Sequence, residues 1–131
     1  MRNHTERVER FYEEIWNRHD KSWIPRLIHE DFSFRGSLGD EKRGHEGFAD
    51  YLDAVHAALG EFHCAIEETV SEGEKVFARM LFSGRHKGEL FGHPPSGKVV
   101  SWAGAAVFTF SGELIRDLWV LGDVHGLLRQ L

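Results

Sequence analysis

A single aspartate stands in the apolar run LWVLGDVHGLLRQL, residues 118–131, near the end of the chain. A charge among apolar residues is costly unless it is paired, hydrogen-bonded or kept neutral. Asp123 can cap a helix that starts in VHGLLRQL, since Asp is a favoured N-cap, or it can be a catalytic acid/base. A cap hydrogen bond lowers the pKa of a carboxyl and an apolar pocket raises it, so the direction of the shift separates the two roles.

Two basic side chains in one predicted strand are further candidates for chemistry. His86 ends the predicted strand within FSGRHKG and could reach the mouth of a pocket as a general base or a hydrogen-bond partner of a substrate. Arg79 lies in the apolar run VFARMLF, where an inward guanidinium would pair with Asp117, Asp123 or an anionic substrate. Structural roles stay open for both, because a strand-end histidine is more often structural and an outward Arg79 or a structural ion pair is the simpler interpretation.

Neither a metal site nor a nucleotide site is predicted. The nine histidines show no H-x-x-x-H or H-E-x-x-H spacing and form no cluster with the single cysteine. The stretch GHPPSGKV is close to a phosphate-binding loop, but Val99 stands where Ser or Thr would hold magnesium. Pro94 and Pro95 also lack the backbone N–H donors that would cradle phosphates, so we interpret the stretch as a turn between strands.

The composition predicts one globular domain over residues 1–131. Hydrophobic residues make up 41% and charged residues 28%, and the net charge of −5 gives no basic footprint for nucleic acid. The lone Cys64 cannot form an intrachain disulfide and fits a reducing compartment. Without an apolar leader or a run of membrane-spanning length, a cytoplasmic location and no membrane partner are expected.

The elements that must position these groups are helices in the first half of the chain and strands in the second. Apolar spacing predicts helices over 5–17 and 45–60, and a short helix between them with Asp20 or Ser22 as its cap and Pro25 in its first turn. DFSFRG predicts a short strand, and alternating runs predict four strands in FHCAIEETV, EKVFARMLFSGRHKG, KVVSWAGAAVFTF and ELIRDLWVL. This order predicts an α+β fold, with helices packed on one face of a curved antiparallel meander that can enclose a cone-shaped cavity.

The aromatic content of 12% is enough to line an apolar pocket as well as to fill a core. Strand alternation puts Leu121 and Asp123 on the same face as Trp119, if the strand continues through Gly122. Core packing is the alternative role for every candidate wall residue, and for Tyr12 and Phe34 it is equally well supported. The candidates for the pocket wall are Tyr12, Trp16, Phe34, Trp102 and Trp119.

The stretches GHEGFADYL, SGRHKGELFGHPPSGKVVSWAG and LIRDLWVLGDVHGLLRQL resemble the SnoaL-like polyketide cyclase family of the NTF2-like superfamily. The likeness covers nearly the whole chain. Its most specific parts are PPSGK, where the family has a PPTGK-like turn, and W-x-x-x-D-x-x-G-L-L-x-Q-L from Trp119 to Leu131. The resemblance implies an NTF2-like (cystatin-like) cone with a deep apolar pocket, and it implies no metal and no organic cofactor.

The resemblance also implies a mechanism. The family's polyketide cyclases close a ring by an intramolecular aldol step, with an aspartate near the end of the last strand as acid/base, and Asp123 falls at that position. It would take a proton from a hydrophobic, carbonyl-bearing molecule and return one to the forming alkoxide, with a pKa lifted toward neutrality. The family's polar side chains on the preceding strand are replaced by WAGAAVFTF, which leaves His86 and Arg79 as leading substitutes for holding the oxyanion.

Two classes of function follow. The first is a small cofactor-independent enzyme of the cyclase, isomerase or lyase type; a hydrolase or dehydratase on the same scaffold would differ in substrate more than in residues. The second is a non-catalytic NTF2-like module that binds an apolar small ligand or a protein partner, in which Asp123 is a solvated cap. A homodimer that pairs sheet to sheet is expected from the resemblance, and the long apolar strands would need such a cover.

Overall fold

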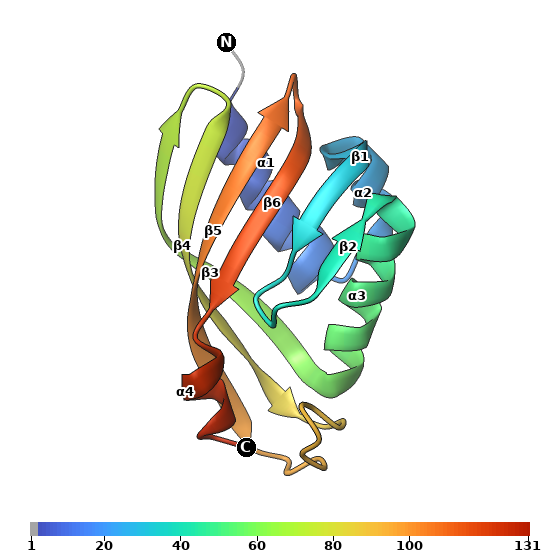
Figure 1. The fold of residues 1–131 in the computed structure, drawn as a ribbon, viewed down its shortest axis with the longest axis vertical. Helices are drawn as coiled ribbons and strands as arrows, with labels where there is room; N and C mark the ends of the chain where they lie inside the picture. The colour runs from blue at the N-terminus through green and yellow to red at the C-terminus, as the bar shows by residue number, and fades with distance from the viewer. Residues whose placement is uncertain (1–2) are drawn as a thin grey trace.

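The computed structural model describes residues 3–131, which form one curved six-stranded sheet with helices on one face (Figure 1). The order across the sheet is β2-β1-β6-β5-β4-β3. Its strands are β1 (Ile28–Arg35), β2 (Glu41–Arg43), β3 (Leu59–Glu72), β4 (Lys75–His86), β5 (Val99–Ser111) and β6 (Leu114–Gly122). The predicted α+β arrangement is confirmed, and β3 to β6 form the predicted antiparallel meander.

The first strand joins the sheet in a way that the sequence does not predict. β1 pairs in parallel with β6, the last strand, and the short edge strand β2 pairs with β1 on its other side. A pairing between the first and the last strand of the chain leaves no local pattern, because the two partners are far apart in sequence. The sheet is therefore mixed rather than purely antiparallel.

The first predicted helix is present, but its second half is wound differently. Asn3 caps α1 (His4–Arg10) by accepting a hydrogen bond of 3.0 Å from the amide of Glu6, and the chain continues into the π-helix η1 (Phe11–Asn17). A π-helix is rare and is often found next to functional sites. This one buries Phe11, Tyr12 and Trp16 against the sheet.

The remaining helices follow the predicted signals. Asp20 caps η2 (Lys21–Trp23), which leads into α2 (Ile24–Leu27) with Pro25 in its first turn. α3 (Gly44–Ala58) buries an apolar face, and α4 (Val124–Leu128) follows the end of β6. No helix within residues 3–131 is long and apolar enough to cross a membrane.

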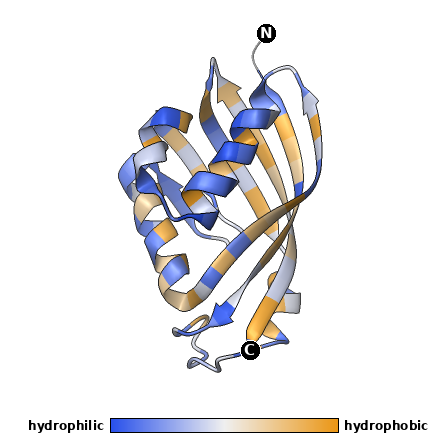
Figure 2. Ribbon diagram, turned by 180° about the vertical axis from the view of Figure 1, so that it is seen from behind, coloured by the Kyte–Doolittle hydropathy of each residue, from blue (hydrophilic) through white to orange (hydrophobic). Residues whose placement is uncertain are grey.

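The core lies between the helices and the concave face of the sheet. Hydrophobic and polar residues alternate along the long strands, as Figure 2 shows, so β4 and β5 each have one buried face. The rings of Phe11 and Phe108 meet edge to face at 5.4 Å, and Phe11 also contacts Phe48 at 5.7 Å. Aromatic rings from η1, α3 and β5 therefore hold the helices on the sheet.

Candidate functional site

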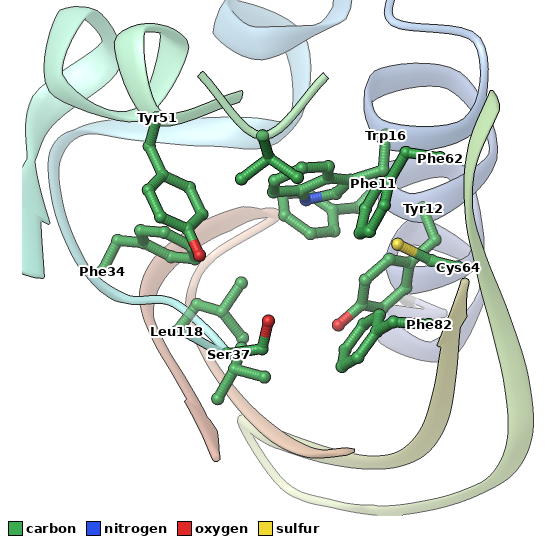
Figure 3. A pocket seen from close by; sticks show the side chains of 12 residues that line it. Phe11, Tyr12, Trp16, Phe34, Ser37, Tyr51, Phe62, Cys64, Phe82 and Leu118 are labelled. Carbon is green, nitrogen blue, oxygen red and sulfur yellow. The ribbon is translucent and has the colours of Figure 1, made fainter. Parts of the chain in front are cut away.

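A cavity lies between the helices and the concave face of the sheet, as the close-up in Figure 3 shows. It contains about 320 Å³ of space between atoms, a figure that includes open solvent, but the centre of a water-sized sphere reaches only about 20 Å³ of it, which is room for about one water. Its walls come from η1, α3, four of the strands and the segment that follows β1. The lining residues are Phe11, Tyr12, Trp16, Phe34, Ser37, Tyr51, Val55, Phe62, Cys64, Phe82, Leu118 and Val120.

Three hydroxyl groups point into this otherwise apolar space, from Tyr12, Ser37 and Tyr51 (Figure 3). Tyr12 keeps only 3% of its surface exposed, and its hydroxyl has no hydrogen-bond partner within residues 3–131. The Tyr51 hydroxyl likewise has no partner with hydrogen-bond geometry within residues 3–131, although it lies beside the backbone of Leu38 and the hydroxyl of Ser37. Leaving a buried hydroxyl unpaired costs about 1–3 kcal/mol, so the cavity contains a donor that a ligand or a water could satisfy.

Burial keeps the ionisable groups of the cavity in their neutral forms. It raises the pKa of Tyr12 well above its ordinary value, and the nearby Cys64 raises it further. Burial raises the pKa of Tyr51 as well, although the Leu38 backbone lowers it in part, and it raises the pKa of the Cys64 thiol. At neutral pH both phenols are therefore hydrogen-bond donors, and Cys64 is a protonated thiol rather than a nucleophilic thiolate.

Side chains outside the cavity fix its walls. The side-chain amide of Asn17, at the end of η1, accepts from the Cys64 amide at 2.7 Å and donates to the Cys64 carbonyl at 3.0 Å. His56 Nε2 lies 2.8 Å from the Trp16 carbonyl oxygen, and its ring stacks on the Trp16 indole. These contacts tie the π-helix to β3 and α3, which sets where Tyr12 and Trp16 meet the cavity.

Three of the five predicted wall residues line the cavity: Tyr12, Trp16 and Phe34. Trp102 is buried one layer behind, where it packs on Phe62 at 6.0 Å and on Phe82 at 5.5 Å, and its indole N–H has no partner within residues 3–131. Trp119 lies on the opposite face of the sheet with 42% of its surface exposed.

Asp123 lies at the end of β6 as the N-cap of α4. Its Oδ1 accepts a hydrogen bond of 2.9 Å from the Gly126 amide, and the residue is exposed. β6 ends at Gly122, so Asp123 does not continue the strand of Trp119 and Leu121, whose shared face is the outer one. The cap interpretation is confirmed. The acid/base role of Asp123 stays a prediction, and its carboxylate is not among the groups that line the cavity.

Polar contacts hold His86 and Arg79, although the buried Nε2 of His86 has no partner within residues 3–131. His86 is fully buried; its Nδ1 lies 3.0 Å from the Ser96 hydroxyl and accepts from the Ser96 amide at 3.3 Å, which ties β4 to the loop before β5. Arg79 points outward, and its Nε donates to Glu68 Oε1 at 3.2 Å. This agrees with the outward or ion-paired interpretation of Arg79, and neither residue lines the cavity.

The sequence analysis missed the polar lining residues Ser37, Tyr51 and Cys64. Tyr51 could have been found, because it lies three residues after Phe48 on the apolar face of α3, where a buried phenol brings a hydroxyl into the core. Cys64 alternates with Phe62 along β3, which places both side chains on the inner face. Ser37 lies in a loop and carries no comparable signal.

Comparisons with known proteins agree with this geometry. A model of the SnoaL-like polyketide cyclase family matches residues 6–131, nearly the whole chain. The chain belongs to the SnoaL-like polyketide cyclase family. A comparison with curated proteins finds no significant match.

Solved structures share the fold. TsrD from Streptomyces laurentii superposes with a TM-score of 0.84 at 27% identity, covering 96% of this chain and 92% of TsrD. A SnoaL-like polyketide cyclase from Agrobacterium tumefaciens has a TM-score of 0.84 at 20% identity over 99% of this chain and 98% of that one. A Catenulispora acidiphila protein with a ketosteroid isomerase-like fold, solved with trimethylamine, has a TM-score of 0.82 at 17% identity, covering 95% and 91% of the two chains. The predicted NTF2-like cone is confirmed.

Proposed function

We propose that this SnoaL-like protein binds a small, uncharged, largely apolar molecule with a carbonyl group in the aromatic cavity and acts on it without a cofactor. The observation that carries the proposal is the buried Tyr12 hydroxyl, which lacks a partner within residues 3–131 and points into the cavity. A ligand oxygen that accepts from this phenol would supply the missing hydrogen bond. No charged side chain is among the lining residues, which favours an uncharged ligand.

The proposed chemistry is proton transfer next to that carbonyl. Removal of a proton from the carbon beside the carbonyl gives an enolate, whose oxygen the neutral phenols of Tyr12 and Tyr51 would stabilise. In an aldol ring closure the enolate carbon bonds to a second carbonyl carbon of the same molecule, and the resulting alkoxide takes up a proton. The phenols thus take the role for which the sequence analysis had only His86 and Arg79.

Asp123 is the proposed acid/base, from its position in the family motif. It follows Gly122, where an added Cβ would lie 2.5 Å from the carbonyl oxygen of Ser37, so Asp123 is one residue from the rim of the cavity. Its carboxylate now accepts from the Gly126 amide, and it would have to leave this cap to reach a ligand. The proposal therefore needs a direct test of proton transfer.

A second candidate is a non-catalytic module that binds the same class of ligand. Two observations favour it: the lining residues include no carboxylate and no imidazole, and Asp123 already serves as a helix cap. Both candidates predict binding in the cavity. They differ in whether the protein moves protons.

The test uses prodan, an uncharged fluorescent naphthyl ketone that reports polarity through its emission. Binding is followed by fluorescence, and proton transfer by exchange of the hydrogens beside its carbonyl in heavy water, read by NMR. The enzyme proposal expects faster exchange than in buffer, loss of the acceleration in Asp123→Asn, and unchanged prodan affinity in that variant.

The matched control is Asp20→Asn, which alters another helix cap, whose Oδ1 accepts from the Ser22 amide at 3.0 Å. It should keep the exchange activity. Binding without exchange in the wild type would favour the binding module, and no binding to the cavity would contradict the proposal itself.

A second copy of the chain is the proposed protein partner, with both copies paired through the outer face of the sheet. Leu81, Trp119 and Leu121 are exposed there, and Leu81 and Leu121 lie opposite the alanines Ala103 and Ala105 of β5. An apolar sheet face of this kind is a candidate interface. Light scattering of the wild type and of Leu121→Asp tests it, with a dimer expected for the first and a monomer for the second.

A cytoplasmic location also remains a prediction.

A further inference from the structure

Nearly all of the residues that line the cavity lie in regular structure. Of its twelve lining residues, eleven are buried and lie in helices or paired strands. The remaining one, Ser37, is partly exposed and lies in the connection between β1 and β2. A ligand can therefore enter with the least disruption of hydrogen-bonded structure where Ser37 covers the cavity.

The connection around Ser37 is a turn that bonds mainly to itself. The Gly36 amide donates to the Asp40 carbonyl at 2.8 Å, and the Gly39 amide donates to the Gly36 carbonyl at 3.0 Å. Gly39 has a φ of 98°, a backbone conformation that other residues adopt with strain. Within residues 3–131, no backbone–backbone hydrogen bond joins Ser37 or Leu38 to another element. The turn can therefore move as a unit without breaking the ladder of the sheet.

Packing contacts hold the turn over the cavity. A Cβ added at Gly36 would lie 2.5 Å from the hydroxyl oxygen of Tyr51, so this phenol rests directly on the glycine. The Ser37 carbonyl packs on Gly122 in the same way, since a Cβ added at Gly122 would lie 2.5 Å from the Ser37 carbonyl oxygen. The side chain of Leu38 packs partly buried against the core.

We propose that residues 37–40 form a lid over the aromatic cavity, held shut by the contacts of Tyr51 with Gly36, of Gly122 with Ser37, and of Leu38 with the core. Opening of the lid would admit ligands and small reagents to the cavity while the sheet and the helices stay folded. The role of the lid in ligand entry rests on the proposed function, but its motion can be measured without any ligand.

Cys64 can serve as a chemical probe of lid opening, because it is the only cysteine of the chain, is buried and lines the cavity. The experiment measures how fast a small uncharged thiol reagent, methyl methanethiosulfonate, labels Cys64 in the full-length protein, followed by mass spectrometry. Labelling through local opening should depend little on low urea concentrations, whereas labelling through global unfolding should rise steeply with urea.

Two variants loosen the lid without altering a cavity-lining residue. Gly122→Ala places a Cβ against the Ser37 carbonyl, and Leu38→Ala removes the packing of the turn on the core. Each should speed labelling by about fivefold or more, with little urea dependence. Gly47→Ala is the matched control, because its Cβ would make an ordinary contact of 3.5 Å with Lys42, and it should keep the wild-type rate.

The outcomes separate the lid from the proposed function. Faster labelling in Leu38→Ala alone supports the lid even if Gly122→Ala fails to fold. Wild-type labelling that follows global unfolding, or lid variants that react no faster than Gly47→Ala, would overturn it. Saturating prodan should protect Cys64; if the lid variants accelerate labelling but prodan neither binds nor protects, the lid stands and the proposed function fails.

Discussion

The polar groups at the cavity wall and at the end of β6 differ in whether they have a hydrogen-bond partner. Tyr12 is buried, and its hydroxyl has no partner within residues 3–131. Asp123 is exposed, and its carboxylate accepts the Gly126 amide. A group that the fold already satisfies needs no ligand, whereas an unsatisfied buried donor leaves a free energy that a ligand can recover. The structure therefore indicates the Tyr12 phenol as the group that a ligand would contact, whereas the sequence motif indicates the Asp123 carboxylate.

The largest expected effect tests the assignment of the two faces of β6. Val120→Asp would place an unpaired carboxylate in the cavity wall and should lower the free energy of unfolding by roughly 3–5 kcal/mol. Leu121→Asp, one residue later on the outer face, should change it by less than about 1 kcal/mol, since its charge stays in water. Urea unfolding is measured at protein concentrations low enough to keep the wild type and both variants monomeric, so that loss of the proposed dimer does not contribute. Equal losses would contradict the inward and outward assignments.

A smaller effect is expected at the cap. Asp123→Ala removes the acceptor for the Gly126 amide and should cost about 1 kcal/mol of stability, while Asp123→Asn, which keeps a capping oxygen, should cost much less. Thermal unfolding of the two variants gives the comparison. If the Asp123→Ala variant proved as stable as Asp123→Asn, the hydrogen bond from the Gly126 amide to the Asp123 carboxylate would not stabilise the protein, which would contradict the cap assignment.

The smallest effect concerns the pH dependence of the wall. Burial lowers the pKa of His56 below its ordinary 6.5, and the neighbouring His19 lowers it further. The unfolded chain then binds a proton more readily than the folded one as the pH falls. The stability that the folded protein has while His56 is neutral is fully present above about pH 6.5. It is lost as the pH falls through the lower pKa that His56 has in the folded state.

Between pH 7.5 and pH 5, the wild type should therefore lose more free energy of unfolding than His56→Gln. The difference between the two slopes isolates His56, because the other histidines are present in both proteins. Identical slopes, measured by urea unfolding across this range, would show that protonation of His56 is not coupled to folding.

Local patterns predicted most of the fold. The alternation in β3 to β6 and the apolar face of α3 are periodic signals, and the structure confirms the elements that they predict. The parallel pairing of β1 with β6 and the π-winding of Phe11–Asn17 were not predictable. The first depends on partners far apart in the chain, and the second keeps an apolar spacing that resembles an α-helix.

The site was harder to predict than the fold, because it depends on which side of a strand faces the helices. Alternation correctly grouped Trp119 and Leu121, but it could not say that their shared face is the outer one, and β6 ends at Gly122 before Asp123. The neighbours Leu118 and Val120 line the cavity instead. Tyr12 was on the predicted wall, yet only the structure shows that its hydroxyl lacks a partner within residues 3–131.

The central claim is that the Tyr12 hydroxyl is kept for a ligand, and one comparison tests it most directly. Tyr12→Phe and the wild type are measured for free energy of unfolding in urea and for prodan affinity by fluorescence. Removing an unpaired buried hydroxyl should raise the stability of the free protein by about 1 kcal/mol and weaken prodan binding by about threefold to tenfold. A variant that is less stable and binds prodan as tightly as the wild type would contradict the account.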